Sequence, residues 1–351
     1  MLALAMTAPL LSLRRLGKGG QCSEFTLHRP RCNFLMIKSD IGINTPAEPG
    51  FVIGVDLGGT KIAVALADCH AAVVAEVVEP TDTRGAAYVA EQIVRLAKQL
   101  CNDVELDLSA IRGGVIGVPG AVSPKTGRVS LAVNVAGLDD FDLARHLAEA
   151  LHVYFSIEND ANLALIGEMA SGTARNHRSA ALITVGTGVG MGFAVDGQLV
   201  RGANGSAGEV AYLPIGRDLT SQDALRIGAF ELEVGSRGIV SRYRACGHND
   251  ASTVREIFDL AEDGSRDAQA VIRETARWIA LGILAIQSIL DLEVFLLGGS
   301  IGARAPLVLA VQHEIRMFHA NPPPVLAAEL GTRAGLTGAI YEAMKRSRRA
   351  I

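Results

Sequence analysis

The chain has 351 residues, of which 49% are apolar, and a formal net charge of −4. This length and apolar content are enough for a buried core and for two domains. Nucleic-acid-binding proteins usually carry an excess of positive charge, so the charge balance favours small-molecule ligands over nucleic acid.

Cysteine usage and hydropathy indicate a compartment. The five cysteines are scattered and form no CxxC motif or Cys/His cluster, as is common in reducing compartments. No apolar run approaches the roughly 18 to 20 residues that cross a bilayer. We therefore expect a cytoplasmic protein with no membrane partner.

Residues 1–50 differ in character from the remainder and are predicted to be a disordered or wrongly assigned N-terminal extension. In a secretory signal the positive charges precede the apolar stretch, whereas here Arg14, Arg15 and Lys18 follow it. We interpret residues 1–35 as a disordered extension or a product of start-site choice rather than as a targeting sequence.

The first half of the folded region begins with strands and then alternates helix and strand. Apolar runs separated by tight turns predict two or three consecutive strands, at 51–55, 62–67 and 71–78. Apolar residues at helical spacing predict a helix over 86–101. The pattern then predicts, in order, a buried strand at 114–118, a helix at 141–151 and a strand at 153–157.

The second half repeats this organisation. Residues 180–185 and 190–195 predict strands around a glycine turn, as at 51–66. The remaining predicted elements are a helix at 253–260, a helix at 268–290, a strand at 294–297, and helices at 306–318 and 338–346. The sequence predicts two related α/β halves with ligands in the cleft between them. We expect a smaller domain over 51–158, onto which residues 335–351 pack back, and a larger domain over 159–334.

The turn after the first predicted strand is rich in glycine. Its adjacent glycines permit φ > 0 and let backbone N–H groups approach a phosphate, and Thr60 adds a hydroxyl donor. Asp56 at the strand end can hold Mg²⁺ directly or through water. Taken alone, such a turn is more often a plain hairpin. The candidate phosphate-binding residues here are Asp56, Gly58, Gly59, Thr60 and Lys61.

Two further glycine turns strengthen this interpretation. Gly186, Thr187 and Gly188 lie between two predicted strands, in the same arrangement as the first turn. Two matched turns suggest a clamp on the β- and γ-phosphates of a nucleotide. A third turn follows a buried strand and opens a helix-like stretch, a place that suits a nucleoside or phosphate. Its candidates are Gly298, Gly299 and Ser300.

The three turns, in this order, resemble those of the sugar kinase, heat-shock ATPase and actin superfamily. Within it, three motifs are similar to the ROK family of bacterial sugar kinases and repressors: Gly117-Val118-Pro119-Gly120, Glu158-Asn159-Asp160-Ala161-Asn162 and Gly208-Glu209. The similarity covers roughly residues 51–344. It implies an α/β, two-domain actin-like ATPase (ribonuclease H-like) fold with a cleft between the domains. It further implies ATP and Mg²⁺ as cofactors, hexose and nucleotide as partners, and a homodimer.

The resemblance also implies roles for individual residues. Phosphoryl transfer to an alcohol needs a positioned hydroxyl, an acceptor for its proton and charge neutralisation on the phosphate. Asp160 matches the catalytic aspartate, although its place before a predicted helix suits an N-cap equally well. Glu231 matches a sugar-contacting glutamate, with Glu233 as a competing candidate. The other implied substrate contacts are Asn134, Asn159, Glu209, Gly117, Pro119 and Gly120.

One part of the family pattern is missing. Many ROK proteins follow the Gly-Glu pair with Ile-Gly-His and then a CxCGxxGC cluster, and that histidine and three cysteines hold a structural zinc. This chain has Tyr212 at the histidine position and no cysteine over 219–229. We therefore expect no zinc and a segment 214–230 held by other packing. Tyr212 also changes a sugar contact, which leaves the hexose open.

The sequence thus predicts an ATP-dependent sugar kinase, a phosphotransferase with an alcohol acceptor. Glucose is the first choice of substrate and its 6-hydroxyl the expected acceptor, with fructose, mannose or an N-acetylhexosamine as alternatives and polyphosphate as an alternative donor. A sugar-responsive regulator is the second reading, but residues 1–50 show no paired amphipathic helices of a helix-turn-helix domain. A catalytically silent sugar sensor is the third.

Overall fold

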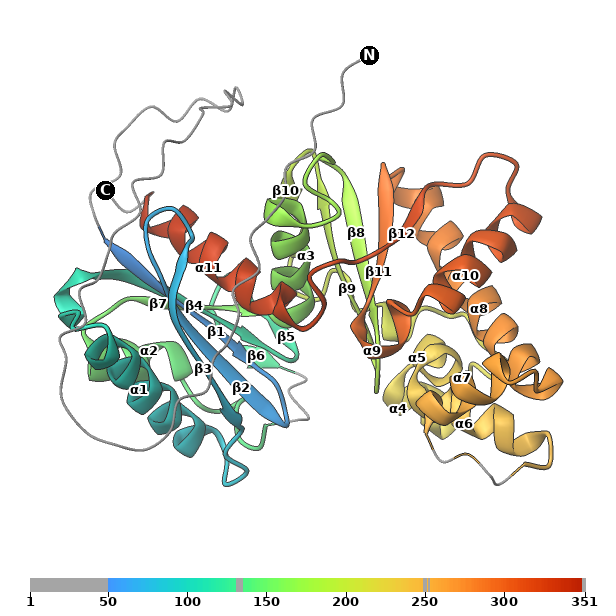
Figure 1. Cartoon of the computed structure of the whole chain (residues 1–351), viewed down its shortest axis with the longest axis horizontal. Coiled ribbons are helices and arrows are strands. Elements are labelled where there is room, and N and C mark those ends of the chain that lie inside the picture. Colours follow the sequence, from blue (N-terminus) through green and yellow to red (C-terminus); the bar gives the residue numbers. More distant parts are fainter. Residues whose placement is uncertain (1–49, 131–134, 249–250, 252, 349–351) are drawn as a thin grey trace, which may run out of the picture. The chain divides into compact units, whose positions relative to one another are not determined.

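Two five-stranded β-sheets form the framework of the chain (Figure 1). The computed structural model describes residues 50–130, 135–248, 251 and 253–348. The predicted extension over 1–35 and the candidate Asn134 therefore lie outside the described residues. Among the described residues, no helix combines the length and the apolar character that a membrane crossing needs.

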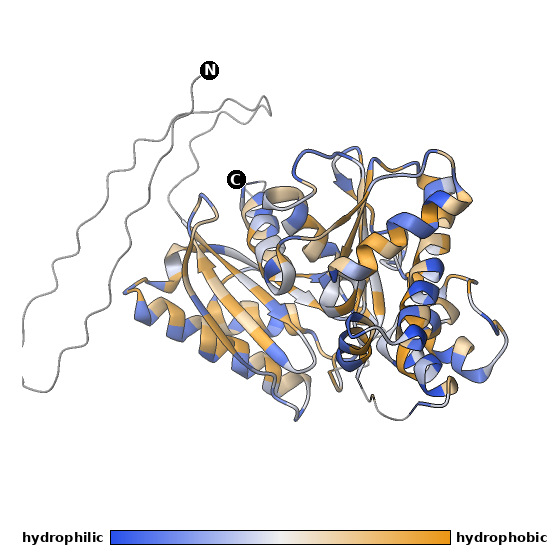
Figure 2. Cartoon of the chain, turned by 45° about the vertical axis from the view of Figure 1, so that its right-hand side comes forward, coloured by the Kyte–Doolittle hydropathy of each residue, from blue (hydrophilic) through white to orange (hydrophobic). Residues whose placement is uncertain are grey.

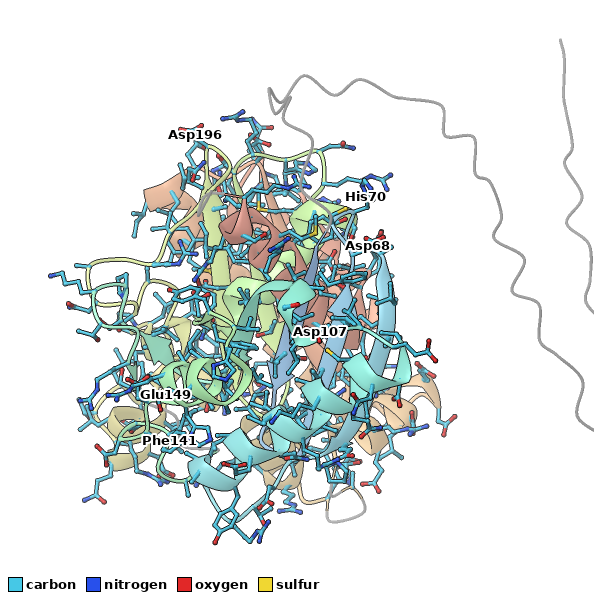
Figure 3. The ribbon with its side chains drawn as sticks, turned by 90° about the vertical axis from the view of Figure 1, so that its left-hand side faces the viewer. Asp68, His70, Asp107, Phe141, Glu149 and Asp196 are labelled. Carbon is cyan, nitrogen blue, oxygen red and sulfur yellow. The ribbon has the colours of Figure 1, made fainter. Side chains whose placement is uncertain are left out.

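The first sheet has the strand order β3-β2-β1-β4-β7. Its strands are β1 (Phe51–Leu57), β2 (Lys61–Ala67), β3 (Val73–Pro80), β4 (Ile111–Val118) and β7 (Phe155–Asn159). β1, β2 and β3 form an antiparallel meander, whereas β1, β4 and β7 run parallel. At the β2–β3 turn, the Asp68 carboxylate accepts the backbone N–H of His70 (2.8 Å), and Figure 3 labels both residues.

The second sheet repeats the same plan, with the order β10-β9-β8-β11-β12. Its strands are β8 (Ala180–Val185), β9 (Val189–Val195), β10 (Gln198–Leu199), β11 (Val294–Gly298) and β12 (Val325–Ala327). β8, β9 and β10 are antiparallel, and β8, β11 and β12 are parallel. A separate two-stranded ribbon consists of β5 (Ala121–Val122) and β6 (Val129–Ser130).

Helices cover both faces of the two sheets. The α-helices are α1 (Ala86–Asp103), α2 (Leu143–Leu151), α3 (Asp160–Ser171), α4 (Gln222–Ile227), α5 (Ala229–Val234), α6 (Ser236–Ala245), α7 (Val254–Glu262), α8 (Arg266–Leu290), α9 (Gly299–Gly302), α10 (Ala305–Phe318) and α11 (Ala334–Ser347). Three short 3₁₀ turns are η1 (Leu108–Ala110), η2 (Val210–Tyr212) and η3 (Gly331–Arg333). In Figure 2 the central strands are mostly orange, whereas the helices combine orange with blue, as expected for amphipathic helices around apolar sheets.

Helix α3 packs against both sheets. Its Leu163 belongs to a core cluster with Val52 and Val115 of the first sheet. Its Leu165 belongs to another cluster with Leu182 and other residues of the second sheet. The residues at the start of α3 are therefore held between the two halves of the protein.

Helices α3 and α11 lie side by side at very close range (Figure 1). Glycines allow this approach, because a Cβ at Gly167 would overlap the carbonyl oxygen of Ala334, and a Cβ at Gly338 would overlap that of Leu163. The predicted C-terminal helix at 338–346 begins four residues earlier, at Ala334. This extension adds a turn whose Ala334 lies against Gly167 of α3.

Most predicted elements are confirmed, with bounds shifted by a few residues. The strand predicted at 180–185 matches β8, and the helix predicted at 141–151 begins two residues later, after its N-cap Asp142. The α-helices α4, α5 and α6 were not predicted from sequence. Two of them, α4 and α5, have six residues each, too few for a helical apolar period to show.

Candidate functional site

The carboxyl ends of the parallel strands bring the predicted site residues together. In the first sheet Asp56 of β1 is in register with Gly117 of β4, which in turn pairs with Glu158 of β7. In the second sheet Thr184 of β8 pairs with Gly298 of β11. Ligands of open α/β sheets bind at this end of the strands, where the connecting loops diverge.

A pocket of about 350 Å³ lies at these strand ends and is lined by residues of both sheets' connections. Three carboxyl side chains line it: Asp160, Glu209 and Glu231. The predicted contacts Pro119, Gly120, Asn159, Gly186, Gly188 and Gly299 line it as well. The pocket therefore unites residues from all three motifs named above.

Asp160 is the first residue of α3, and its neighbour Asn159 is the N-cap. The Asn159 side-chain oxygen accepts the N–H of Asn162 (3.0 Å), and its amide nitrogen donates to the carbonyl of Gly120 (3.0 Å). The backbone N–H of Ala161 donates to Oδ1 of Asp160 (2.7 Å). Since Asn159 already caps the helix, capping does not explain the carboxylate at Asp160.

The surroundings of Asp160 disfavour its ionised form. Desolvation by the enclosing protein is the main cause that raises the pKa of Asp160 to about 6. The hydrogen bond from Ala161 opposes this shift, and the repulsion of Asp56 and Glu209 adds to it. The side chain is nevertheless accessible from the open pocket. A carboxyl with a pKa near neutrality and access to a ligand suits proton transfer.

The pKa values of the neighbouring acids are also raised. Desolvation raises the pKa of Glu209, with a further contribution from Glu231, and it also raises the pKa of Glu231. Desolvation raises the pKa of Asp56, and Lys61 partly offsets this. None of Asp160, Glu209 and Glu231 forms an ion pair with another described residue. We refer to these three as the pocket carboxyls.

The structure separates the two candidate glutamates of α5. Glu231 lines the pocket, and its Oε2 accepts the backbone N–H of Val189 in β9 (2.9 Å). Glu233 is buried elsewhere, where Oε2 accepts from Arg242 (3.1 Å) and Oε1 from the backbone N–H of Arg217 (2.9 Å). Of the two, only Glu231 can meet a ligand in this pocket.

The second and third glycine turns pack against each other beside the pocket. Gly299 has φ +80°, and a Cβ there would overlap the backbone of Val185, so only glycine fits. Gly186 accepts the backbone N–H of Ser236 at the start of α6 (3.0 Å). These contacts fix the 186–188 turn, whose glycines leave it open to a phosphate.

The first glycine turn differs from the prediction. Gly58 and Gly59 do not adopt positive φ, so the expectation of a positive-φ turn there is wrong. The turn is instead closed by a hydrogen bond from Gly58 N–H to the Lys61 carbonyl (3.0 Å), and Thr81 donates its hydroxyl to Gly58 O (2.7 Å). Gly59, Thr60 and Lys61 are exposed and line none of the pockets described here. Asp56 alone approaches the pocket, close enough to affect the pKa of Asp160.

A second pocket of about 680 Å³ adjoins the first, because Gly186 lines both. Thr187 and Ser300 from the predicted turns line it. Its other polar residues were not predicted from the sequence, and they include four arginines: Arg237, Arg244, Arg255 and Arg304. Their positive charge suits a polyanion such as a nucleoside triphosphate. The density of arginine over 237–244 was the available signal.

Besides the residues of the first turn, three further predicted residues do not line the pockets. Gly117 lies beneath the site, where a Cβ would meet the side chain of Leu163 at 2.9 Å. Tyr212 is 49% exposed on η2 and does not line the pocket that contains Asp160, Glu209 and Glu231. Gly298 is the buried end of β11 and supports the turn from below.

The donor set fits a magnesium ion that arrives with a nucleotide. Within the described ranges, no group of three or more His, Cys, Asp or Glu side chains could hold a metal ion alone. Magnesium usually binds to one or two carboxylates, with phosphates and waters completing its shell. Asp56, near Asp160 and with a raised pKa, offers one such carboxylate.

Similarity to known proteins identifies the family of this chain. The profile described as "ROK family" matches residues 52–346. The chain belongs to the ROK family. Glucokinases of Streptomyces coelicolor and Halalkalibacterium halodurans are 29% and 26% identical to it, over 83% and 82% of this chain and 96% and 92% of their own length.

Solved structures of ROK proteins agree with this assignment. A ROK hexokinase from Thermus thermophilus is 31% identical, with a TM-score of 0.74 over 85% of this chain and 99% of that chain. A ROK glucokinase from Streptomyces griseus, solved with glucose and AMPPNP, is 27% identical with a TM-score of 0.68 over 84% of this chain and 100% of that chain. The predicted family and the actin-like ATPase fold are confirmed, and this ROK protein is a sugar kinase.

Proposed function

We propose that this ROK protein transfers the γ-phosphoryl group of ATP to the 6-hydroxyl of a hexose, with glucose as the first candidate and Asp160 as the general base. The observation that carries the proposal is the position of Asp160. It lies at the junction of β7 and α3, in a pocket shared with the 186–188 turn, and its pKa is raised to about 6. The related glucokinases support the choice of sugar.

The pocket carboxyls would have two roles, sugar binding and proton transfer. Glu209 and Glu231 accept hydrogen bonds from hydroxyls of the sugar ring, and Asn159 retains one amide N–H for a hydroxyl oxygen after its bond to Gly120. Asp160 takes the proton of the reacting hydroxyl as its oxygen attacks the phosphorus, and the nucleoside diphosphate leaves.

The nucleotide would occupy the arginine-lined pocket. Its phosphates would extend past Gly186, which lines both pockets, toward the sugar. Backbone N–H groups of the 186–188 turn would donate hydrogen bonds to them. Magnesium, held in part by Asp56, would neutralise charge on the phosphates. Inorganic polyphosphate is the alternative donor, since arginine side chains bind either polyanion. We further propose a cytoplasmic homodimer without structural zinc.

A turnover assay tests the proposal directly. Purified protein is incubated with ATP and Mg²⁺ and with glucose, fructose, mannose or N-acetylhexosamines, and ADP release and sugar phosphate are both measured. We expect the highest kcat/KM for glucose. Absence of turnover with ATP, GTP and polyphosphate for every sugar would refute the kinase activity. Calorimetric sugar binding without turnover would then identify a silent sensor.

A further inference from the structure

A third cavity, of about 720 Å³, lies along β7 and shares no lining residue with the two pockets described above. β7 is the edge strand of the first sheet, so one side of its backbone has no neighbouring strand of that sheet. The cavity walls are residues 122–127, part of α2, residues 154–158, Arg201 and the end of α11. The proposed kinase activity uses none of these residues.

The cavity wall is strongly basic, in contrast to the chain as a whole. Five cationic side chains line it: Lys125, Arg145, Arg201, Lys345 and Arg346. Two acidic side chains, Glu158 and Glu342, also line it, which leaves an excess of three positive charges. The whole chain carries a net charge of −4. Such a local reversal of sign attracts an anionic ligand.

The two acids form a closed network with two of the arginines. Arg201 contacts Glu158 (2.6 Å) and Glu342 (3.3 Å), and Arg346 contacts the same two carboxylates (3.3 and 2.8 Å). The glutamates are nearly buried, whereas the side chains of both arginines are 31% exposed. The network is neutral and holds the arginines in place, with part of each guanidinium accessible.

The remaining charge comes from outside this network. Arg145 pairs with Glu149 of α2 (2.8 Å), which Figure 3 labels. Lys125 and Lys345 form no ion pair with any residue in the part of the chain that the structure covers. Both lysines are exposed and can reach a ligand without breaking an existing contact.

A buried hydroxyl on the same wall lacks a hydrogen-bond partner. Ser156 is 8% exposed, lines the cavity, and its Oγ makes no hydrogen bond with a described residue. Because side chains alternate along a strand, Ser156 is on the same face of β7 as Glu158. Buried hydroxyls are normally paired, so an unpaired one on a cavity wall suggests a polar occupant.

We propose that this cavity binds the phosphomonoester of a sugar-sized polyol. A phosphate dianion matches the positive excess and the two unpaired lysines. Ser123 and Thr126 of the β5–β6 turn offer hydroxyls to a polyol. The volume lies within the range of small-molecule sites. This site stands on its own geometry and would exist even if the chain had no kinase activity.

The cavity is also connected to the catalytic pocket through β7. The second oxygen of Glu158 accepts the backbone N–H of Asn159 (3.2 Å) and the amide of Asn162 (3.0 Å). An occupant that contacts Arg201 and Arg346 would therefore touch the residues that hold the Asn159–Asp160 turn.

Isothermal titration calorimetry on the full chain tests the site. Glucose 6-phosphate and, separately, inorganic phosphate are titrated in the presence of saturating glucose and AMPPNP, which keep the catalytic pockets occupied. We expect wild-type protein to bind glucose 6-phosphate more tightly than inorganic phosphate. The double variant Lys125→Gln/Lys345→Gln should bind glucose 6-phosphate at least about tenfold more weakly.

Matched controls make the result decisive. Lys98→Gln removes an exposed lysine of α1 outside the cavity and should leave the affinity within about twofold of wild type. The exposed positions of Lys125 and Lys345 predict an unchanged melting temperature and basal kcat. No binding by wild type at millimolar ligand, or equal binding by the double variant, would overturn the site. Equal affinities for inorganic phosphate and glucose 6-phosphate would overturn its assignment to a sugar phosphate.

Discussion

Two groups of carboxyl side chains lie in opposite surroundings, although some of their members are near neighbours in the sequence. The pocket carboxyls Asp160, Glu209 and Glu231 have raised pKa values and no ion-pair partner among the described residues. Glu158, Glu233 and Glu342, which we call the paired carboxylates, are buried and each contacts an arginine. A single residue separates Glu158 from Asp160, and likewise Glu231 from Glu233.

The difference supports the proposed roles of Asp160, Glu209 and Glu231 in ligand binding and proton transfer. A buried carboxylate without a cation is costly, so folded proteins usually pair it or protonate it. Where the pairing is missing, a ligand or its metal can supply the compensating groups, and such sites are common in active centres. The paired carboxylates thus hold parts of the fold together, and under the proposed function the pocket carboxyls would form hydrogen bonds with the substrate.

The largest expected effect is on turnover. Asp160→Asn should lower kcat by about 10² to 10⁴, because amide nitrogen cannot take the hydroxyl proton. Nucleotide affinity and melting temperature should change little, since Asn159 holds the helix cap. Asp160→Ala should lower kcat similarly. Steady-state kinetics at saturating sugar and ATP measure this, and full turnover in Asp160→Asn would remove Asp160 from the mechanism.

The second prediction compares the two glutamates of α5. Glu233→Ala should lower the free energy of unfolding by about 3–5 kcal/mol, because it leaves the buried Arg242 without its carboxylate. Glu231→Ala, two residues away, should leave stability nearly unchanged and raise the KM for sugar. Urea unfolding and kinetics on both variants test the contrast. Equal losses of stability would show that the distinction between pocket and paired carboxyls is wrong at this helix.

The sequence could predict the repeating part of the fold and most of the site. Strand, glycine turn and strand recur in both halves, and strand ends such as Asp56 and Asp160 lie where the parallel strands bring them together. The resemblance to ROK motifs then predicted that Asp160, Glu209 and Asn159 belong to one site. Local patterns were sufficient because these residues directly follow regular strands or turns.

The sequence could not predict features that depend on distant packing. The orientation of α5 decides between Glu231 and Glu233, and it is set by Phe230, whose ring packs over Gly282 of α8. The arginines of the second pocket come from α6, the start of α7 and the N-cap of α10, and only the fold brings these segments together. At the first turn, the hydrogen bond from Thr81, 23 residues away from Gly58, favours a closed hairpin over a positive-φ loop.

The third prediction concerns pH. Asp160 must be ionised to accept a proton, and its pKa is raised to about 6, so kcat/KM should rise with pH and level off above about 7. At pH 5 we expect about a tenth of the value at pH 7. Ionisation is disfavoured in the folded state, so the same shift lowers stability as pH rises from about 4 to 6. The residual kcat/KM of Asp160→Asn should not fall at acidic pH in this way. An identical fall in that variant would show that another group is responsible for the pH dependence.

The smallest expected effect is that of metal removal. Structural zinc typically contributes on the order of 10 kcal/mol, yet we expect no stoichiometric zinc in purified protein and an unchanged melting temperature in EDTA. Protein contacts hold the segment 214–230 instead: Glu233 accepts the N–H of Arg217 (2.9 Å), and Ser221 caps α4. EDTA presaturated with Ca²⁺ is the control, and elemental analysis measures the zinc. One zinc per chain, or a lower melting temperature in free EDTA alone, would show that other ligands replace the missing cysteines and that the paired carboxylate Glu233 is not what holds this segment.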